Sequence, residues 1–439
     1  MTNHISRRNF FISMAILAFM YFVFGFVSWI NAILIPYFKI VCELDTHVKT
    51  MLVAFAFYIA YLVMSPPAGF LLKKVGFKRG IMIGFFILAT GAFIFIPAAI
   101  TRIYGIFLAG LFTMGSGLAI LQTAANPYVT IIGPIDKAVP RMSFCGVFNK
   151  FAGIVSPLIF SAIILKASDK SLLESLPAMS AIEKTAALNE LTLRMMIPYT
   201  CLGALLIGVG LFIRYSALPE INTEDENKEL AESHSGKTSI FQFPYLILGF
   251  LAILTHVGTQ VIAIDTIIGY ANSMGMDLIS AKQLPSYTLA MTMIGYLIGI
   301  SCIPGLISQT NALRVCTITG LMISLCILFI PGQMMYHGHE VSISIWFIAL
   351  LGLPNALIYA GIWSLAIRNL GRFTKTGASI LVMGLVGNAI LPMIWGYYAD
   401  TIGARAAYWV LLPCFVYLVF YAVYGHKITS WTKKRHEKI

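Results

Sequence analysis

The feature that most constrains this chain is a series of long apolar runs separated by short polar segments. A helix that crosses a bilayer needs about 20 consecutive apolar residues, and roughly twelve such runs follow one another along the sequence. The runs are continuous and lack the two-residue alternation of membrane barrels. We therefore predict an all-α membrane protein with twelve transmembrane helices. They are expected near residues 11–38, 49–72, 80–100, 103–132, 143–166, 193–214, 243–270, 284–307, 313–333, 341–367, 377–398 and 405–425.

The charge content excludes most other classes of protein. Charged residues make up 11% of the 439 residues and hydrophobic residues 59%, whereas soluble domains carry about 25% charged residues. So few charges cannot cover a soluble surface of this size, which excludes a soluble enzyme, a nucleic-acid-binding protein and a disordered chain. We expect a lipid bilayer as the surroundings, no nucleic-acid partner and a functional monomer.

Motifs for enzymatic chemistry are missing from the sequence. It contains no phosphate-binding G-x-x-x-x-G-K-[ST] loop, no H-E-x-x-H and no G-x-S-x-G, so neither ATP hydrolysis nor catalysis is predicted. Most of the 7 cysteines fall inside apolar runs without ligand spacing and are interpreted as small buried apolar side chains. We expect no metal site and no cofactor other than a coupling proton or sodium ion.

The basic residues predict the orientation in the membrane. Placing the N-terminus in the cytoplasm assigns 20 of the 30 Lys and Arg residues to cytoplasmic segments and 9 to the outer side, with Lys150 inside a span. Cytoplasmic loops carry an excess of Lys and Arg. Both termini are therefore predicted to be cytoplasmic, which agrees with an even number of spans.

Two polar segments divide the chain. Residues 167–192 are expected to form an outer loop with a short amphipathic helix. Residues 216–241, which contain an acidic run, are expected to be a cytoplasmic linker between an N-terminal six-helix bundle over 1–215 and a C-terminal one over 242–439. The fourth and tenth runs share a Gly-Leu start, a central Asn and a final Gly, as in transporters built from two related halves. These runs read GLAILQTAANPYVTIIG and GLPNALIYAGIWSLAIRNLG.

Several motifs resemble one known family when taken in order. The first run contains FGFVSWINAILIPYFK, the fourth contains LQTAANPYVTIIGP, the fifth contains Phe148–Asn149, and the tenth and eleventh read SLAIRNLGRFTKTGASILVMGLVG. The chain resembles the major facilitator superfamily and, within it, the fucose–proton symporter and glucose/galactose transporter family. The resemblance implies two pseudo-symmetric six-helix bundles, a central sugar site, alternating access and a cation gradient as the driving force. It also implies a bacterial cytoplasmic (inner) membrane.

The sequence departs from that family at three positions. Family symporters carry Asp where this chain has Ala32, and the fucose symporter carries a proton-binding Glu where it has Gln122. Gln122 is typical of the glucose/galactose branch. The superfamily loop motif survives as GFLLKKVG, with Lys73 in place of the usual Asp, which puts the gating role of that Asp in doubt.

Polar side chains at membrane depth are the candidate ligand-binding residues, because such groups usually face a cavity or each other. Gln122 and Asn126 are four residues apart and share a helix face, and Pro127 frees backbone carbonyls beside them. Asn31, in the first run, could bind a sugar hydroxyl or a neighbouring helix. The resemblance adds Asn149 and Gln260, each at a family position.

The tenth and eleventh runs offer further candidates. Asn355, Tyr359 and Trp363 recur every fourth residue, which predicts one polar-aromatic stripe along a helix face. Aromatic rings and amides are usual in hexose sites, but the same stripe could be packed core. Asn388, close to Pro392, is a candidate of the same kind.

Two charged residues lie well inside predicted spans, Lys150 and Asp265. If Gly25 is matched to Gly258, Asp265 falls opposite Ala32 in the other half. Asp265 is then either the coupling-cation site or the partner of Lys150, and it could also face water at an outer end. His256 shares a helix face with Gln260 and is either a proton relay or a packed neutral histidine.

The predicted function is secondary active import of a neutral, glucose- or galactose-like hexose with proton or sodium symport. One alternative is an uncoupled facilitator, in which Lys150 and Asp265 form a fixed pair. Another is a non-transporting sugar sensor. A sensor would normally carry an added soluble domain, whereas the residues after Tyr424 form a short basic stub.

Overall fold

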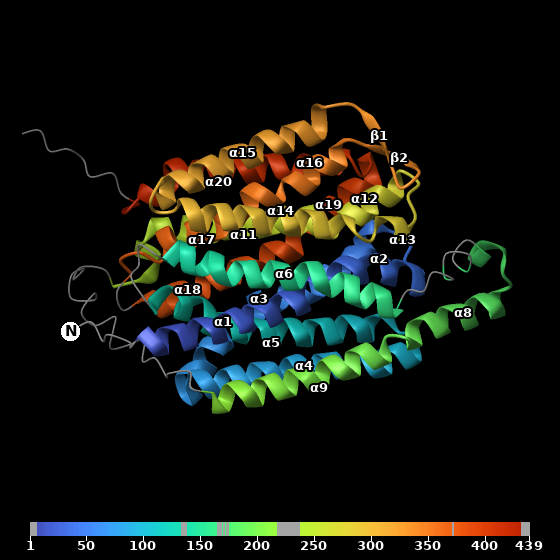
Figure 1. Ribbon diagram of the computed structural model, residues 1–439, viewed down its shortest axis with the longest axis horizontal. Coiled ribbons are helices and arrows are strands. Elements are labelled where there is room, and N and C mark those ends of the chain that lie inside the picture. Colours follow the sequence, from blue (N-terminus) through green and yellow to red (C-terminus); the bar gives the residue numbers. More distant parts are fainter. Residues whose placement is uncertain are drawn as a thin grey trace, which may run out of the picture.

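The computed structural model describes residues 7–132, 138–164, 169, 172, 175–216, 238–370 and 373–431. Among these residues, twelve helices are long and apolar enough to cross a membrane, as predicted. Long helices run side by side along the longest axis of the molecule (Figure 1). The spans are Asn9–Val41, His47–Leu72, Lys78–Thr101, Tyr104–Val129, Val139–Ile164, Ala181–Tyr215, Pro244–Asp265, Leu278–Cys302, Gln309–Phe329, Ser344–Ala366, Thr376–Ile402 and Ala406–Lys427.

The chain forms two sets of helices, one from each half of the sequence. The first set comprises α1 (Arg7–Trp29), α2 (Asn31–Val41), α3 (His47–Val75), α4 (Phe77–Thr101), α5 (Tyr104–Ile131), α6 (Ala138–Ile164), α8 (Ala181–Leu193) and α9 (Met196–Tyr215), with the 3-10 turn η2 (Leu176–Ala178). The second comprises α11 (Pro244–Asp265), α12 (Ile267–Ser273), α13 (Leu278–Ala281), α14 (Leu284–Cys302), α15 (Gln309–Phe329), α16 (Ser344–Leu350), α17 (Gly352–Ala366), α18 (Thr374–Met383), α19 (Gly387–Ile402) and α20 (Leu411–Val423). Its 3-10 turns are η3 (Ile240–Gln242), η5 (Gly384–Val386), η6 (Ala406–Val410) and η7 (Gly425–Lys427). Most of the predicted linker lies outside the described residues, so the domain boundaries stay a prediction.

A short hairpin marks one end of the molecule. Strands β1 (Gln333–Tyr336) and β2 (His339–Ser342) pair antiparallel with Tyr336 opposite His339. The two turn residues, His337 and Gly338, have φ values of 48° and 80°, as a tight type I′ hairpin requires. We call this end, which also carries α8, the hairpin end. The opposite end, where α1 begins and α20 ends, is the terminal end (Figure 1).

The predicted amphipathic helix of the 167–192 segment is α8, which leads almost directly into α9, and together the two helices form the sixth span. Helix α8 begins at a capping box in which Ser180 and Glu183 satisfy each other's backbone N–H groups, which stabilises a helix start. Within α8, Lys184 Nζ lies 2.6 Å from Glu43 Oε1, and the hydrogen bond from Lys184 lowers the pKa of the Glu43 carboxyl. The helix extends beyond the rest of the bundle (Figure 1).

Helices are interrupted at four places. Breaks separate α1 from α2, α11 from α12, and α16 from α17, and the 3-10 turn η5 separates α18 from α19. A break frees backbone N–H and C=O groups, which is tolerated at membrane depth where protein or a polar cavity surrounds them. The interrupted helices therefore indicate where a polar site can be built.

The two helix sets meet along α6 and α14 and along α3 and α19. At the hairpin end, Asp400 of α19 caps the start of α3. Its carboxylate accepts hydrogen bonds from the backbone N–H groups of His47 (3.0 Å) and Val48 (3.2 Å), and it lies 2.6 Å from His47 Nδ1. At the terminal end, α18 packs against α3 and α5. The structure thus holds the sets together at both ends.

We expect Asp400→Asn to loosen the hairpin end, because hydrogen bonds to a charged acceptor contribute about 1.5–3 kcal/mol each. Amide hydrogen exchange of the first turn of α3, followed by mass spectrometry in detergent, should be faster by about tenfold or more. Glu190→Gln, at an exposed carboxylate on α8, is the matched control and should leave that turn unchanged. Equal exchange in wild type and Asp400→Asn would show that this cap does not hold the end closed.

Candidate functional site

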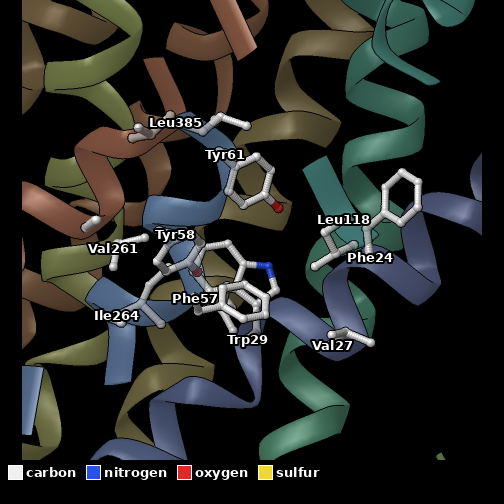
Figure 2. Packing of buried hydrophobic residues seen from close by; sticks show 14 of the residues in the cluster. Phe24, Val27, Trp29, Phe57, Tyr58, Tyr61, Leu118, Val261, Ile264 and Leu385 are labelled. Atoms are coloured by element: carbon white, nitrogen blue, oxygen red, sulfur yellow. The ribbon is translucent and has the colours of Figure 1, made fainter. Parts of the chain in front are cut away.

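A cavity of about 120 Å³ lies between the two helix sets. One water molecule needs about 10–15 Å³ of such a cavity volume, so the cavity holds several waters or one small polar molecule. Figure 2 shows buried side chains of both halves near one another, with Trp29 and Tyr61 from the first half and Val261 and Leu385 from the second. Of these, Trp29, Tyr61 and Leu385 line the cavity. The polar and aromatic lining residues are Tyr21, Phe24, Ser28, Trp29, Tyr58, Tyr61, Gln122, Asn126, Asn149, Lys150, Gln260, Tyr296, Tyr359 and Asn388.

Asn149 is held in place by the close approach of α1 and α6. A Cβ on Gly25 would lie 2.0 Å from the Asn149 carbonyl oxygen, so a residue without a side chain is required there. Trp29 Nε1 donates to Asn149 Oδ1 at 3.0 Å, and Asn149 Nδ2 donates to the Tyr21 carbonyl at 3.1 Å. The amide is thereby fixed at the cavity wall, as the family resemblance implied.

Gln122 and Asn126 line the same cavity from α5, one turn apart. Gln122 Nε2 donates to Tyr61 OH at 2.9 Å. Asn126 Oδ1 accepts a short hydrogen bond from Tyr21 OH, while Asn126 Nδ2 donates to Tyr359 OH at 3.1 Å. Tyr359 belongs to α17, so this last bond joins the two halves of the chain inside the cavity.

Lys150 provides the second polar connection between the halves. Its ammonium donates to Gln260 Oε1 on α11 at 3.2 Å and lies 3.8 Å from the centroid of the Trp29 ring. The side chain is 4% exposed, so it faces the cavity and does not extend to the headgroups. The cation–π contact and the amide hydrogen bond partly replace the water that the ammonium has lost.

Asp265 ends α11 and does not line the cavity. It is 2% exposed, which excludes the water-facing position. Neither carboxylate oxygen has a hydrogen-bond partner among the described residues. Lys150 lies within electrostatic range, but the two residues form no direct ion pair in this structure.

The packing of two glycines supports the proposed match between the halves. Gly25 of span 1 meets α6 of span 5, and a Cβ on Gly258 of span 7 would lie 2.7 Å from the Gly387 carbonyl of span 11. Each glycine thus allows the first helix of its half to approach the fifth. Helix α2, which contains Ala32, also contacts α11 and α12. The placement of Asp265 opposite Ala32, which depends on this match, stays a prediction.

Two residues of the predicted stripe lie away from the cavity, and the structure also describes His256 and the backbone of Asn31. Of the α17 stripe, only Tyr359 lines the cavity. Asn355 and Trp363 are buried at 1% and 0% exposure, because α17 is surrounded by α11, α14 and α15. His256 is fully buried with neither ring nitrogen hydrogen-bonded among the described residues, which agrees with a packed histidine. Asn31 begins α2, but its side chain lies outside the described part of the structure.

Most of the aromatic residues that line the cavity were not predicted from the sequence. Tyr21, Trp29, Tyr58, Tyr61 and Tyr296 all line the cavity, and none was predicted. A signal existed, because Tyr usually sits at the membrane–water interface, whereas Tyr58 and Tyr61 occur in the middle of the second span. A phenol at that depth requires a polar partner. Asn388, which was predicted, lines the cavity with its Oδ1 unpaired among the described residues.

The model of the Major Facilitator Superfamily matches residues 17–384. The chain belongs to this superfamily. Members of this superfamily are membrane transporters, so the protein is a transporter and not an enzyme. The chain is 32% identical over 425 residues to a glucose/galactose transporter of Brucella abortus, with 96% of each chain covered. It is 30% identical over 405 residues to the L-fucose-proton symporter of Escherichia coli, with 90% of this chain and 89% of that protein covered.

A solved structure supports the same assignment. The fucose:proton symporter of E. coli superposes with a TM-score of 0.72 at 26% identity, covering 97% of this chain and 100% of that one. The predicted fold of two pseudo-symmetric six-helix bundles is thereby confirmed. The protein is a multi-pass membrane protein of the fucose-symporter and glucose/galactose-transporter branch of the superfamily.

We expect Asn149→Ala to destabilise the protein, because the substitution leaves Trp29 Nε1 and the Tyr21 carbonyl without their hydrogen-bond partner at the cavity. The loss should be about 1–3 kcal/mol and should lower the thermal unfolding temperature in detergent. Asn388→Ala, at another cavity-lining amide whose Oδ1 has no partner within the described part of the chain, is the control and should shift this temperature less. An equal or larger shift for Asn388→Ala would contradict the assigned role of Asn149.

Proposed function

We propose that this protein imports a neutral, glucose- or galactose-like hexose by alternating access, with symport of a proton or sodium ion. The observation that carries the proposal is the hydrogen bonding inside the cavity, where amides and phenols of one bundle meet those of the other. A hexose presents hydroxyl groups that both donate and accept. Amides and phenols also do both, so the cavity can exchange its internal bonds for bonds to a sugar.

The charges around the cavity favour a neutral substrate. Lys150 is the one Lys, Arg, Asp or Glu among the lining residues that the structure describes, and Gln260 and the Trp29 ring already contact its ammonium. The described lining holds no carboxylate for a cationic substrate, and burying a charged substrate in a low-dielectric interior would be costly. The rings of Trp29, Tyr61 and Tyr359 add flat apolar faces, which suit the C–H faces of a pyranose.

Alternating access requires two arrangements of the bundles around the cavity. The bonds from Asp400 to the start of α3 and the packing of α18 on α3 and α5 are the contacts that opening at either end would break. A ligand shifts such an equilibrium only by binding one arrangement better than the other. Hydrogen bonds that span both bundles, through Asn126, Tyr359, Lys150 and Gln260, provide that difference.

The relatives support the same substrate class. Two of those compared with this chain are named as a glucose/galactose transporter and an L-fucose-proton symporter, and both names describe sugar carriers. We place the protein in the bacterial cytoplasmic membrane as a functional monomer, with both termini and the terminal end in the cytoplasm. We propose no cofactor beyond the coupling ion and no nucleic-acid partner.

Uptake of radiolabelled glucose and galactose into proteoliposomes tests the proposal. Gln122→Ala and Asn126→Ala should each raise KM by about fivefold to a hundredfold, since a lost ligand hydrogen bond costs about 1–3 kcal/mol. Asn355→Ala is the matched control, because Asn355 is an amide of similar depth that does not line the cavity, and its KM should stay within about twofold. No saturable uptake by the wild type, and no competition by other hexoses, would contradict the proposed function.

A further inference from the structure

The carboxylate of Asp265 is buried where its negative charge would be costly. It is 2% exposed, and both oxygens lack a hydrogen-bond partner among the described residues. An ionised carboxylate in such surroundings is costly unless a charge or hydrogen bonds compensate it. Either a proton or a nearby cation has to neutralise this group.

Lys150 is the nearby cation, and it is engaged elsewhere. Its ammonium has three donors. One goes to Gln260 Oε1, and the charge lies against the Trp29 ring. Gln260 precedes Asp265 by five residues on the same helix, which is about 7.5 Å along the axis. A Lys side chain is flexible enough to exchange one partner for the other.

We propose that Asp265 is the proton-binding site of the transport cycle and that Lys150 competes with the proton for it. The proposal rests on the transport function proposed above. With a proton on Asp265, Lys150 stays at the cavity wall with Gln260 and Trp29, as in this structure. Without the proton, the carboxylate attracts Lys150 away from the cavity and the wall loses a donor.

This exchange couples the proton to the substrate. Because the sugar-competent wall requires a protonated Asp265, the affinity for sugar is full at low pH and falls as the pH rises and the carboxyl loses its proton. By linkage, bound sugar makes the proton harder to lose. Proton and sugar therefore bind together and leave together, as symport requires.

The surroundings of Asp265 suit a proton better than a sodium ion. Hard metal cations are bound by several oxygen ligands at once, whereas the charged group that acts on Asp265 among the described residues is the cation Lys150 and no second carboxylate. The neighbouring hydroxyl of Thr266 already donates to the Ile262 carbonyl. A proton needs only one carboxylate oxygen and no further ligands.

The groups around Asp265 also suggest its route to water. Lys150, from α6, is the charged group of the described residues that acts on it, and His256 on its own helix lies within range of Lys150 instead. On the other side, Thr266 is hydrogen-bonded to Tyr408 at 2.9 Å. The Tyr408 ring packs on Trp395, and Trp395 packs on His47, which binds Asp400. Opening of that contact at the hairpin end would bring water toward Asp265.

Transport in proteoliposomes tests the coupling. With labelled glucose or galactose, an imposed pH gradient should drive accumulation by the wild type at least fivefold above equilibrium, and a sodium gradient should not. Asp265→Asn should lose accumulation but keep sugar exchange within about threefold. The double variant Lys150→Gln/Asp265→Asn, which leaves no stranded charge, should equilibrate sugar without any pH dependence. Asp45→Asn, at an exposed carboxylate of the hairpin end, should behave like the wild type.

A measurement without sugar separates this proposal from the proposed function. Movement of Lys150 away from Trp29 should change the tryptophan fluorescence of the purified protein during a pH titration. The transition should be lost in Asp265→Asn, in Trp29→Phe and in the double variant, and retained in Asp45→Asn. Accumulation by Asp265→Asn equal to wild type, a fluorescence transition that survives this substitution, or accumulation driven by sodium would each overturn the proton site. If no hexose is transported and the titration behaves as stated, the substrate proposal fails and the proton site stands.

Discussion

A polar group at membrane depth has to find its partner inside the protein, and this constraint organises the whole structure. Lipid offers no hydrogen bonds, so the amides and phenols around the cavity bond to one another or to the backbone of a neighbouring span. Asn126 between Tyr21 and Tyr359, and Asn149 between Trp29 and the Tyr21 carbonyl, are direct consequences. The site is therefore assembled from the few groups that the lipid excludes.

The same constraint makes the arrangement of the two bundles sensitive to a ligand bound in the cavity. The bonds from Asn126 to Tyr359 and from Lys150 to Gln260 join the two bundles at the cavity, so a ligand that replaces them changes how the bundles are held together. The contact of Asp400 with α3 holds them at one end. A cavity bonded across its own interface, with separate contacts at the ends, is suited to transport, because small changes at the site bias two discrete arrangements. Asp265 adds a charge whose neutralisation depends on the position of Lys150.

Much of the fold was predictable because hydrophobic length is a strong signal. All twelve runs correspond to spans, and the sixth span begins earlier than its apolar run because the amphipathic helix α8 leads almost directly into α9. Part of the site was also predictable, since Gln122, Asn126, Asn149, Lys150, Gln260, Tyr359 and Asn388 do line the cavity. The tyrosines were missed because a phenol is apolar enough to pass as core. Asn355 and Trp363 were overestimated because four-residue spacing gives a shared helix face but not the neighbour that this face meets.

The sequence by itself determined that this protein spans a membrane twelve times, because 11% charged residues cannot cover a water-exposed surface of this size and the twelve apolar runs are each long enough to cross a bilayer. It also determined the inventory of polar groups inside the spans, including the absence of an acid at Ala32 and Gln122. The tertiary structure decided which of these groups meet. Lys150 contacts Gln260 and Trp29 instead of Asp265, and Asp265 is left without a hydrogen-bond partner among the described residues. The physical reason is that such pairings depend on how closely two helices approach, as at Gly25 against Asn149, and that distance is set by packing between segments far apart in the chain.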